Sequence, residues 1–410
     1  MTIVQKKKII NDPVYGFVSI PAGLIYDLIE QPWFQRLRRI RQLGLTHYVY
    51  PGAQHTRFQH VIGAVYLTQQ AIEILRSKGI DISDQEQEAV CAAVLLHDMG
   101  HGPYSHTLEY MLVKDVSHEA ISIHYMNLLN QQMSGRLDMC IDIFSNKYPK
   151  KFLHQLVSSQ LDMDRLDYLR RDSFFTGVIE GAVGNDRIIN MLNVINNELV
   201  VDEKGIYSVE KFLIARRLMY WQVYLHKTVI SAESLLIKIL ERARQLANKN
   251  VDLFGTPALI HFLNNDINKN NFFANPENIG FYSDLDDEDV FTAIKVWCHH
   301  SDEILRKMCT MLRDRKLFKT ELSKDAITEE RLNEIKENIM KKHSISATDI
   351  DYFVFTDSVK NRAYDLNKIN IKILYKNGEV KDIAKASDLD NIEALGQTVT
   401  KYYLCYLRTY

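Results

Sequence analysis

Apolar residues recur at helical spacing through the first part of the chain. The pattern predicts a short helix over residues 24–29, interrupted by Pro32, and an amphipathic helix over 60–78, ended by Gly79. Residues 209–247 include no glycine or proline, which predicts a long helical run. The larger part of the chain is therefore expected to be helical.

One predicted helix is apolar on nearly all of its faces. It contains the sequence AVCAAVLL at residues 89–96, ends at His97, and can be capped at its N-terminus by Ser83 or Asp84. We expect this helix to be buried at the centre of the fold. The adjacent His97 and Asp98 then lie at a buried helix end, where imidazole and carboxylate groups are costly unless they pair or share a cation.

Other segments depart from helical spacing. Residues 11–16 (NDPVYG) have the composition of a turn, and residues 250–287, rich in Asn and Asp, predict a looped connection with one short helix. A charged helical stretch is expected over 288–342. Residues 369–383 alternate apolar and polar positions around an Asn-Gly pair, which predicts a β-hairpin.

These patterns predict a mostly α fold with a helical core and a smaller C-terminal α+β unit. We expect three parts along the chain. They are a core of residues 1–248, of which 1–20 form a turn and strand segment, connecting loops and helices over 249–349, and the α+β unit over 350–410.

The composition is that of an ordinary folded protein. Hydrophobic residues make up 46% of the chain and charged residues 25%, and the formal net charge is −2. This apolar content argues against disorder, and the near-zero charge argues against a protein that binds long polyanions over its whole surface. Nucleic acid is therefore not a favoured partner.

The cysteines and the hydropathy indicate the cellular compartment in which the protein is expected. The five cysteines include no C-x-x-C pair, which argues against a disulfide framework and against a Cys-based zinc site. The N-terminal sequence lacks the apolar stretch of a signal peptide, and no apolar run approaches the roughly 20 residues of a membrane span. We expect a cytoplasmic protein with no membrane partner.

The histidines are unevenly distributed, because eight of the 14 lie between residues 47 and 124. Imidazole and carboxylate ligands suit divalent metals such as Fe, Mn, Ni or Zn. A single His or Asp is equally typical of a hydrogen-bonded polar residue, but several titratable groups around one buried helix end predict an active site. The eight are His47, His55, His60, His97, His101, His106, His118 and His124.

The ordered residues H…HD…D resemble the HD-domain phosphohydrolase superfamily. Longer strings, among them YPGAQHTRFQHVIGA, LLHDMGHGPYSHTLE and DMDRLDYLRRD, resemble the deoxynucleoside triphosphate (dNTP) triphosphohydrolases. This group includes bacterial dGTPase-like proteins and the animal sterile-alpha-motif/HD protein. The resemblance is loose over the C-terminal third. It implies an HD-domain helical core and the hydrolysis of dGTP or another dNTP to deoxynucleoside and triphosphate.

The resemblance also implies a metal site with a catalytic group beside it. One divalent ion is expected, with Fe, Mn, Ni, Zn and Mg all open, and a further Mg on the nucleotide phosphates. The implied metal ligands are His60, His97, Asp98 and Asp164. The implied catalytic group is His101, His106, Glu109 and His118, with His106 or His118, tuned by Glu109, as the general acid.

The same resemblance implies residues for a dNTP substrate and for an activating nucleotide between subunits of a homodimer or homotetramer. The implied substrate-binding residues are Gln42, Arg57, Arg165, Tyr168, Asp172, Arg216 and Tyr224. The implied activator-binding residues are Lys8, Glu30, Gln35 and Arg38. Part of the family has Asp where this chain has Glu30, and that Asp reads guanine, so selectivity for a guanine activator stays open.

Plainer interpretations of these residues stay open as well. The four arginines between residues 36 and 41 are typical of a solvated helix face, and the aromatic residues between 220 and 224 are typical of core packing. Asp172 could pair with Arg170 or Arg171. The histidines without a role in the resemblance are interpreted as structural, and they are His47, His55 and His124.

Two other functions fit the sequence. The same metal site would serve a different HD phosphohydrolase, such as a nucleotide phosphatase, a cyclic-nucleotide or guanosine-tetraphosphate hydrolase, or a single-strand nuclease. The third interpretation is a nucleotide sensor without activity, and the intact set of implied ligands argues against it. The sequence leaves open the preferred base, the metal, the oligomeric state and the role of the C-terminal unit.

Overall fold

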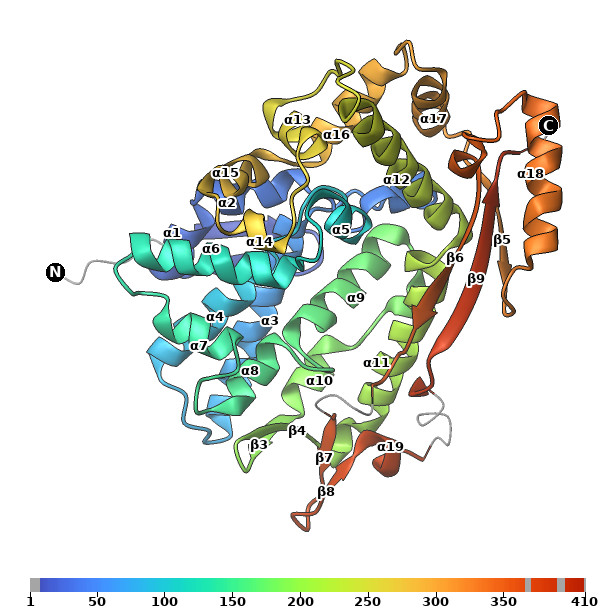
Figure 1. The fold of residues 1–410 in the computed structure, drawn as a ribbon. Helices are drawn as coiled ribbons and strands as arrows, with labels where there is room; N and C mark the ends of the chain where they lie inside the picture. Colours follow the sequence, from blue (N-terminus) through green and yellow to red (C-terminus); the bar gives the residue numbers. More distant parts are fainter. Residues whose placement is uncertain (1–7, 366–369, 389–394, 409–410) are drawn as a thin grey trace.

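The computed structural model describes residues 8–365, 370–388 and 395–408, and it confirms a mostly helical fold (Figure 1). Three helices form its centre, namely α3 (Arg57–Ser77), α4 (Asp84–Leu96) and α9 (Met163–Thr176), with α3 packed against both others. The described helices include none that is long and apolar enough to cross a membrane.

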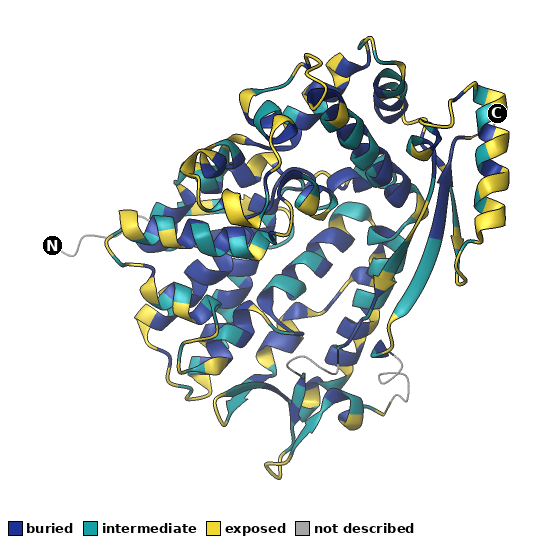
Figure 2. Cartoon of the chain, viewed as in Figure 1, coloured by how far each residue is buried: buried dark blue, intermediate teal, exposed yellow. Residues whose placement is uncertain are grey.

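Helix α4 is buried, as its apolar sequence predicts. Ser83 caps it by accepting a hydrogen bond from the backbone N–H of Glu86, whose side chain accepts one from the Ser83 N–H in return. From Val90 to Leu96 no side chain is more than 2% exposed. Figure 2 shows this buried centre surrounded by more exposed helices.

The predicted N-terminal turn joins strands β1 (Lys8–Asp12) and β2 (Gly16–Ile20), which pair in antiparallel register. Asp12 accepts hydrogen bonds from the backbone N–H groups of Val14 and Tyr15, which fixes the turn. Residues 1–7 of the expected segment lie outside the described residues.

The helical run expected over 209–247 forms, but it is interrupted. The chain forms α11 (Ile206–Met219), a π-helical turn over Tyr220–Tyr224 and then α12 (Lys227–Ala247). His226 is extended, and its Nδ1 accepts the Thr228 N–H as the cap of α12. A side-chain cap and a widened turn thus break the helix without glycine or proline.

The expectation of one short helix within residues 250–287 is wrong. Three helices form there, α13 (Pro257–Asn264), α14 (Lys269–Phe272) and α15 (Pro276–Asp284). The Asn and Thr residues that suggested loops are caps, because Thr256, Asn268 and Asn275 each accept a backbone N–H at a helix start.

The charged stretch that follows is helical with two interruptions. It forms α16 (Asp287–Trp297), α17 (Glu303–Arg313) and α18 (Glu329–His343), with strand β5 (Lys319–Ser323) between the last two. The remaining helices are α1 (Leu24–Ile29), α2 (Pro32–Gln35), α5 (Glu109–Leu112), α6 (His118–Gln132), α7 (Asp138–Phe144), α8 (Lys151–Val157), α10 (Asn185–Asn190) and α19 (Ile383–Ala386).

The C-terminal strands complete sheets that begin earlier in the chain. The predicted hairpin forms from β7 (Lys372–Leu374) and β8 (Val380–Asp382), and its expected first residue, 369, lies outside the described residues. Strand β7 pairs in parallel with β4 (Glu198–Asp202), which itself pairs with β3 (Leu192–Ile195). In the second sheet, β9 (Val399–Tyr406) lies between β5 and β6 (Val354–Asn361).

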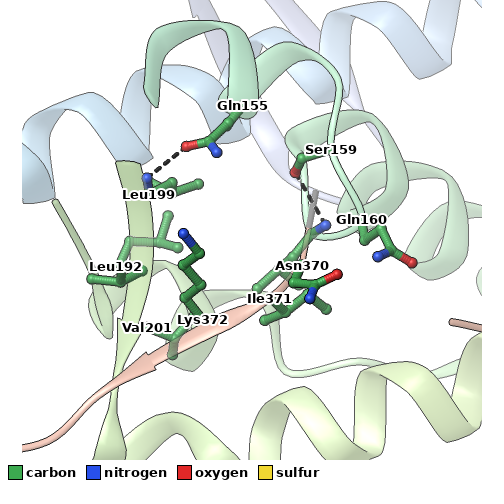
Figure 3. Close-up of a pocket in the computed structure, with 11 residues that line it drawn as sticks. Gln155, Ser159, Gln160, Leu192, Leu199, Val201, Asn370, Ile371 and Lys372 are labelled. Atoms are coloured by element: carbon green, nitrogen blue, oxygen red, sulfur yellow. Dashed lines mark hydrogen bonds between the residues drawn. The ribbon is translucent and has the colours of Figure 1, made fainter. Parts of the chain in front are cut away.

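A pocket lies where β7 meets β4, beneath the segment that joins α8 to α9 (Figure 3). Gln155 closes one side of it by accepting the backbone N–H of Leu199 at 2.6 Å. None of the described residues that line this pocket belongs to the predicted site.

Candidate active site

The three central helices bring the four implied metal ligands together. His60 lies in the first turns of α3, Asp164 in the first turn of α9, and His97 and Asp98 directly after α4. Asp164 Oδ1 lies 3.0 Å from His60 Nε2 and 3.4 Å from His97 Nε2. Asp98 lies 3.2 Å from His97 Nε2 and 3.8 Å from His60 Nε2.

These donors fit a divalent cation. Within the described part of the chain, His60 Nε2 and His97 Nε2 are buried without a hydrogen-bond partner. Burial disfavours the charged imidazoles, but the carboxylates outweigh it and raise the pKa of His60 to about 10 and that of His97 to about 9. The carboxylates therefore create a negative potential at the two imidazoles that favours a bound cation, and imidazole with carboxylate is a donor set for first-row metals.

A buried ionic network orients the His60 ring. Its Nδ1 lies 2.7 Å from Asp167 Oδ2, and Asp167 receives Arg171 Nε at 2.9 Å. Arg171 in turn donates Nη1 to Asp12 at 2.7 Å. On the other ligand, His97 Nδ1 bonds the Val94 carbonyl at 2.6 Å. Both rings are thereby held with Nε2 toward the centre of the cluster.

Asp167 was not among the residues predicted from the sequence, although its distance from Asp164 along the chain could have indicated it. It lies three residues after Asp164 on the same helix, so the two carboxylates share a face.

Replacing Asp167 by Asn is expected to weaken metal affinity about 10–100-fold, as for other partners of ligating histidines. Competition with a chelator measures this affinity, and Asp186→Asn, at an exposed carboxylate, is the control. Equal affinity in both variants would contradict the orienting role.

A second cluster consists of His101, His106 and His118, whose ring nitrogens come within 4.8 Å of one another. Glu109 ties two of them, because its oxygens lie 2.7 Å from His118 Nδ1 and 3.0 Å from His106 Nδ1. Burial opposes the charge on Glu109, but these two hydrogen bonds lower its pKa. The ties at Nδ1 leave Nε2 of His106 and His118 as the nitrogens that can face a ligand.

The two clusters adjoin through His101 and Asp98. His101 Nδ1 lies 3.3 Å from Asp98 Oδ1, and its ring stacks on that of His118 at 3.7 Å between centroids. Burial and the nearby Arg57 guanidinium hold the pKa of His101 well below its ordinary value. His101 is therefore a neutral imidazole between the metal cluster and the exposed His106, whose side chain is 69% accessible.

Arg57, a predicted phosphate ligand, is buried and bonded within the protein. It donates Nη1 to Asp98 and Nε to Ser105 Oγ, the latter at 2.9 Å. Burial would raise the pKa of Asp98, but Arg57 and the neighbouring histidines hold it well below its usual range. The structure thus shows Arg57 bonded to Asp98, an implied metal ligand, a contact that the sequence did not indicate.

Two predicted substrate residues have buried polar atoms without a partner among the described residues. They are Gln42, through Oε1, and Arg216, through Nε. Arg165 donates Nε to the Ser159 carbonyl at 2.8 Å, and Tyr168 lies with its ring centre 6.5 Å from that of His60. Tyr168 thus lies beside the His/Asp cluster, and Gln42 and Arg216 carry unused hydrogen-bonding capacity.

Asp172 pairs with residues other than its arginine neighbours. Its oxygens bond His55 Nε2 and the Tyr224 hydroxyl, each at 2.7 Å. Arg171 instead bonds Asp167 and Asp12. His55, interpreted from sequence as structural, therefore contacts Asp172, one of the predicted substrate residues, and Asp172 in turn contacts Tyr224.

The structure bears on the other plain interpretations of these residues one residue at a time. Arg36 is 1% exposed, so the solvated-face interpretation is wrong for it. Trp221 lies under the Lys401 ammonium at 3.8 Å. His47 bonds the Gly44 carbonyl, and His124 packs on Phe273, outside both histidine clusters.

The implied activator residues form two contacts near the N-terminal hairpin. Lys8 pairs with Glu30 at 2.6 Å, with both side chains at least 40% exposed. Arg38 donates Nε to Gln35 Oε1 at 2.7 Å and lies over the Phe58 ring at 3.5 Å. The four residues remain a predicted activator site.

The chain is similar to a known family and to several known proteins. Residues 183–270 match the family described as HD associated region. The chain is similar to the uncharacterized protein YwfO of Bacillus subtilis, at 31% identity over 98% of this chain and 92% of that protein. It also superposes on the crystal structure of a phosphohydrolase from Bacteroides thetaiotaomicron, with a TM-score of 0.95, 54% identity, and coverage of 98% of this chain and 100% of the other.

Relatives with a named activity match over a shorter length. The deoxynucleoside triphosphate triphosphohydrolase SAMHD1 of Homo sapiens is 29% identical over 55% of this chain and 42% of its own length. The SAMHD1 homolog of Dictyostelium discoideum is 31% identical over 59% of this chain and 50% of its own. The chain thus spans half or less of these two proteins.

Proposed function

Because this chain belongs to the HD-domain dNTP triphosphohydrolase family, a family of phosphohydrolases, we propose that it hydrolyses a dNTP to the deoxynucleoside and triphosphate. The observation that carries the proposal is the contact between the two clusters. A cation-favouring His/Asp cluster adjoins a set of imidazoles whose Nε2 atoms are directed by one carboxylate.

The cation site has a defined chemistry. A divalent ion held by His60, His97, Asp98 and Asp164 would supply a Lewis acid for a phosphate oxygen and a bound water of lowered pKa. The protein's own task there is to hold four donors in place, through Asp167 on His60 and Arg57 on Asp98.

The imidazole set supplies the proton chemistry. The 5′-oxygen that leaves the α-phosphorus needs a proton, and a histidine in its imidazolium form can donate one from Nε2. Glu109 accepts from Nδ1 of His106 and His118, so each presents Nε2 as the donating atom. His101, held neutral, is suited to a hydrogen bond with a phosphate oxygen rather than to charge neutralisation.

The surrounding polar groups fit the rest of a dNTP. Arg216 and Arg165 would offset the triphosphate charge, and the unpaired Nε of Arg216 is free to do so among the described residues. Gln42 Oε1 is available to a sugar hydroxyl, and Tyr168 lies between the cluster and Tyr224 as a wall against a ribose 2′-hydroxyl.

An assay of all four dNTPs, singly and in pairs, tests this function. We expect release of inorganic triphosphate with Mn²⁺ or Mg²⁺ and its loss with a chelator. Turnover of one dNTP only when a second is present would support the activator residues. Release of phosphate, pyrophosphate or nucleotides instead would indicate another HD phosphohydrolase, and no turnover with any metal would favour a sensor.

A further inference from the structure

The loop that carries His106 has an uncommon backbone. Tyr104 and Ser105, both non-glycine, have φ values of 54° and 55°, in the left-handed region that L-residues rarely adopt. His106 follows at once, and Ser105 is the residue that Arg57 bonds. Two such residues in succession persist only where the surrounding structure holds them.

The holding group is the carboxylate of Asp287, which is 1% exposed at the start of α16. Its Oδ1 accepts the backbone N–H of Tyr104 at 2.7 Å, and its Oδ2 accepts the backbone N–H of Arg41 at 3.0 Å. The Arg41 carbonyl accepts the Ser105 hydroxyl at 2.9 Å. One carboxylate therefore joins the left-handed turn to the strand-like segment beside it.

Neighbours of Asp287 hold the same loop at further points. The Tyr282 hydroxyl donates to the Gly100 carbonyl at 2.9 Å. Buried Arg36 donates to the carbonyl of Leu285 and to that of His101, both at 2.9 Å. The end of α15 and the start of α16, residues 282–287, contain none of the implied site residues, and together with Arg36 they fix the backbone of residues 100–104.

We propose that Asp287 is a positioning residue for the reaction, which holds the His101–His106 loop so that the His106 imidazole keeps its place. The inference rests on the proposed function for its kinetic part. Asp287 bonds none of the implied metal ligands, so its effect should appear in turnover and not in bound metal.

The test compares Asp287→Ala and Asp287→Asn with Glu288→Gln, which removes a charge at the exposed neighbouring position. Asp287→Ala is expected to lower kcat about 10–100-fold, because small misplacements of catalytic groups have effects of this size. KM and metal content should stay near wild type. Asn should restore part of kcat, since its Oδ1 can still accept the Tyr104 N–H. Wild-type kcat in Asp287→Ala, or loss of metal with kcat, would overturn the proposal.

A double-mutant cycle separates positioning from general destabilisation. In a protein that already carries His106→Ala, Asp287→Ala should lower kcat less than about 3-fold. The reason is that the effects of substitutions at residues that act together do not add. The same loss on both backgrounds would contradict the proposal. If Asp287→Ala does not fold, Tyr282→Phe, which removes only the hydroxyl bond to Gly100, is expected to lower kcat in the same sense, and an unchanged kcat there would count against it.

Hydrogen–deuterium exchange tests whether Asp287 holds the loop, independently of the proposed function. Peptides covering residues 99–109 should exchange faster in Asp287→Ala than in Glu288→Gln or wild type. If wild type releases no triphosphate, the proposed function fails, whereas the exchange result still decides whether Asp287 holds the loop. Equal exchange in all three proteins would overturn the proposal.

Discussion

Replacing Asp164 by alanine is expected to abolish metal binding and to lower turnover about 10³-fold or more, since metal-assisted charge stabilisation contributes several kcal/mol. A single oxygen of Asp164, Oδ1, lies 3.0 Å from His60 Nε2 and 3.4 Å from His97 Nε2. Its carboxylate also helps to raise the pKa of both imidazoles, so its loss removes much of the negative charge that favours a cation there.

Elemental analysis and triphosphate release measure the two effects of Asp164→Ala. Asp186→Ala, at an exposed position outside the cluster, should keep both metal and activity. Since the Asp164 side chain is 24% exposed, its removal should leave the fold intact. Wild-type metal content in the purified Asp164→Ala protein would show that the cation site lies elsewhere.

Replacing His118 by alanine is expected to lower kcat about 10²–10⁴-fold, the usual contribution of a positioned proton donor. Metal content should not change, because His118 contacts Glu109 and His101 and none of the four implied ligands. His106→Ala tests the other candidate acid in the same way.

His124→Gln is the matched control for these two variants. It belongs to the same histidine-rich stretch and the same helix as His118, but it packs on Phe273 away from both clusters. It should keep near wild-type kcat. Near wild-type turnover in both His118→Ala and His106→Ala would show that neither imidazole is the general acid.

The sequence was most informative where local pattern and chemistry coincide. The apolar faces of α4 predicted a buried helix that ends at His97, and the structure places His97 and Asp98 at that end beside His60 and Asp164. The Asn-Gly hairpin and the N-terminal turn were predicted for the same reason, because each depends on a few adjacent residues.

Features that depend on distant partners could not be predicted. Asp287 contacts Tyr104 across 183 positions of the chain, and only the packing of α16 against the loop makes that contact. The same holds for His55, which bonds Asp172, and for Arg36, which bonds the Leu285 carbonyl, because both partners are distant in the sequence. The break between α11 and α12 was missed because a π-turn and a histidine cap end a helix without glycine or proline.

The predicted division into three parts stays a prediction, and the strand pairing bears on how it should be tested. The parallel pairing of β7 with β4 joins the C-terminal unit to the core, and β5 joins it to the connecting helices. A fragment ending near residue 248 would therefore expose the edge of β4, so tests of activity should use the full chain.

The site of bond cleavage tests the central claim most directly. A dNTP is incubated with the protein and Mn²⁺ in H₂¹⁸O, and the products are identified by mass spectrometry. Attack of water at the α-phosphorus predicts triphosphate that contains one ¹⁸O and a deoxynucleoside that contains none. Formation of a nucleoside monophosphate with pyrophosphate, or of triphosphate without ¹⁸O, would contradict it.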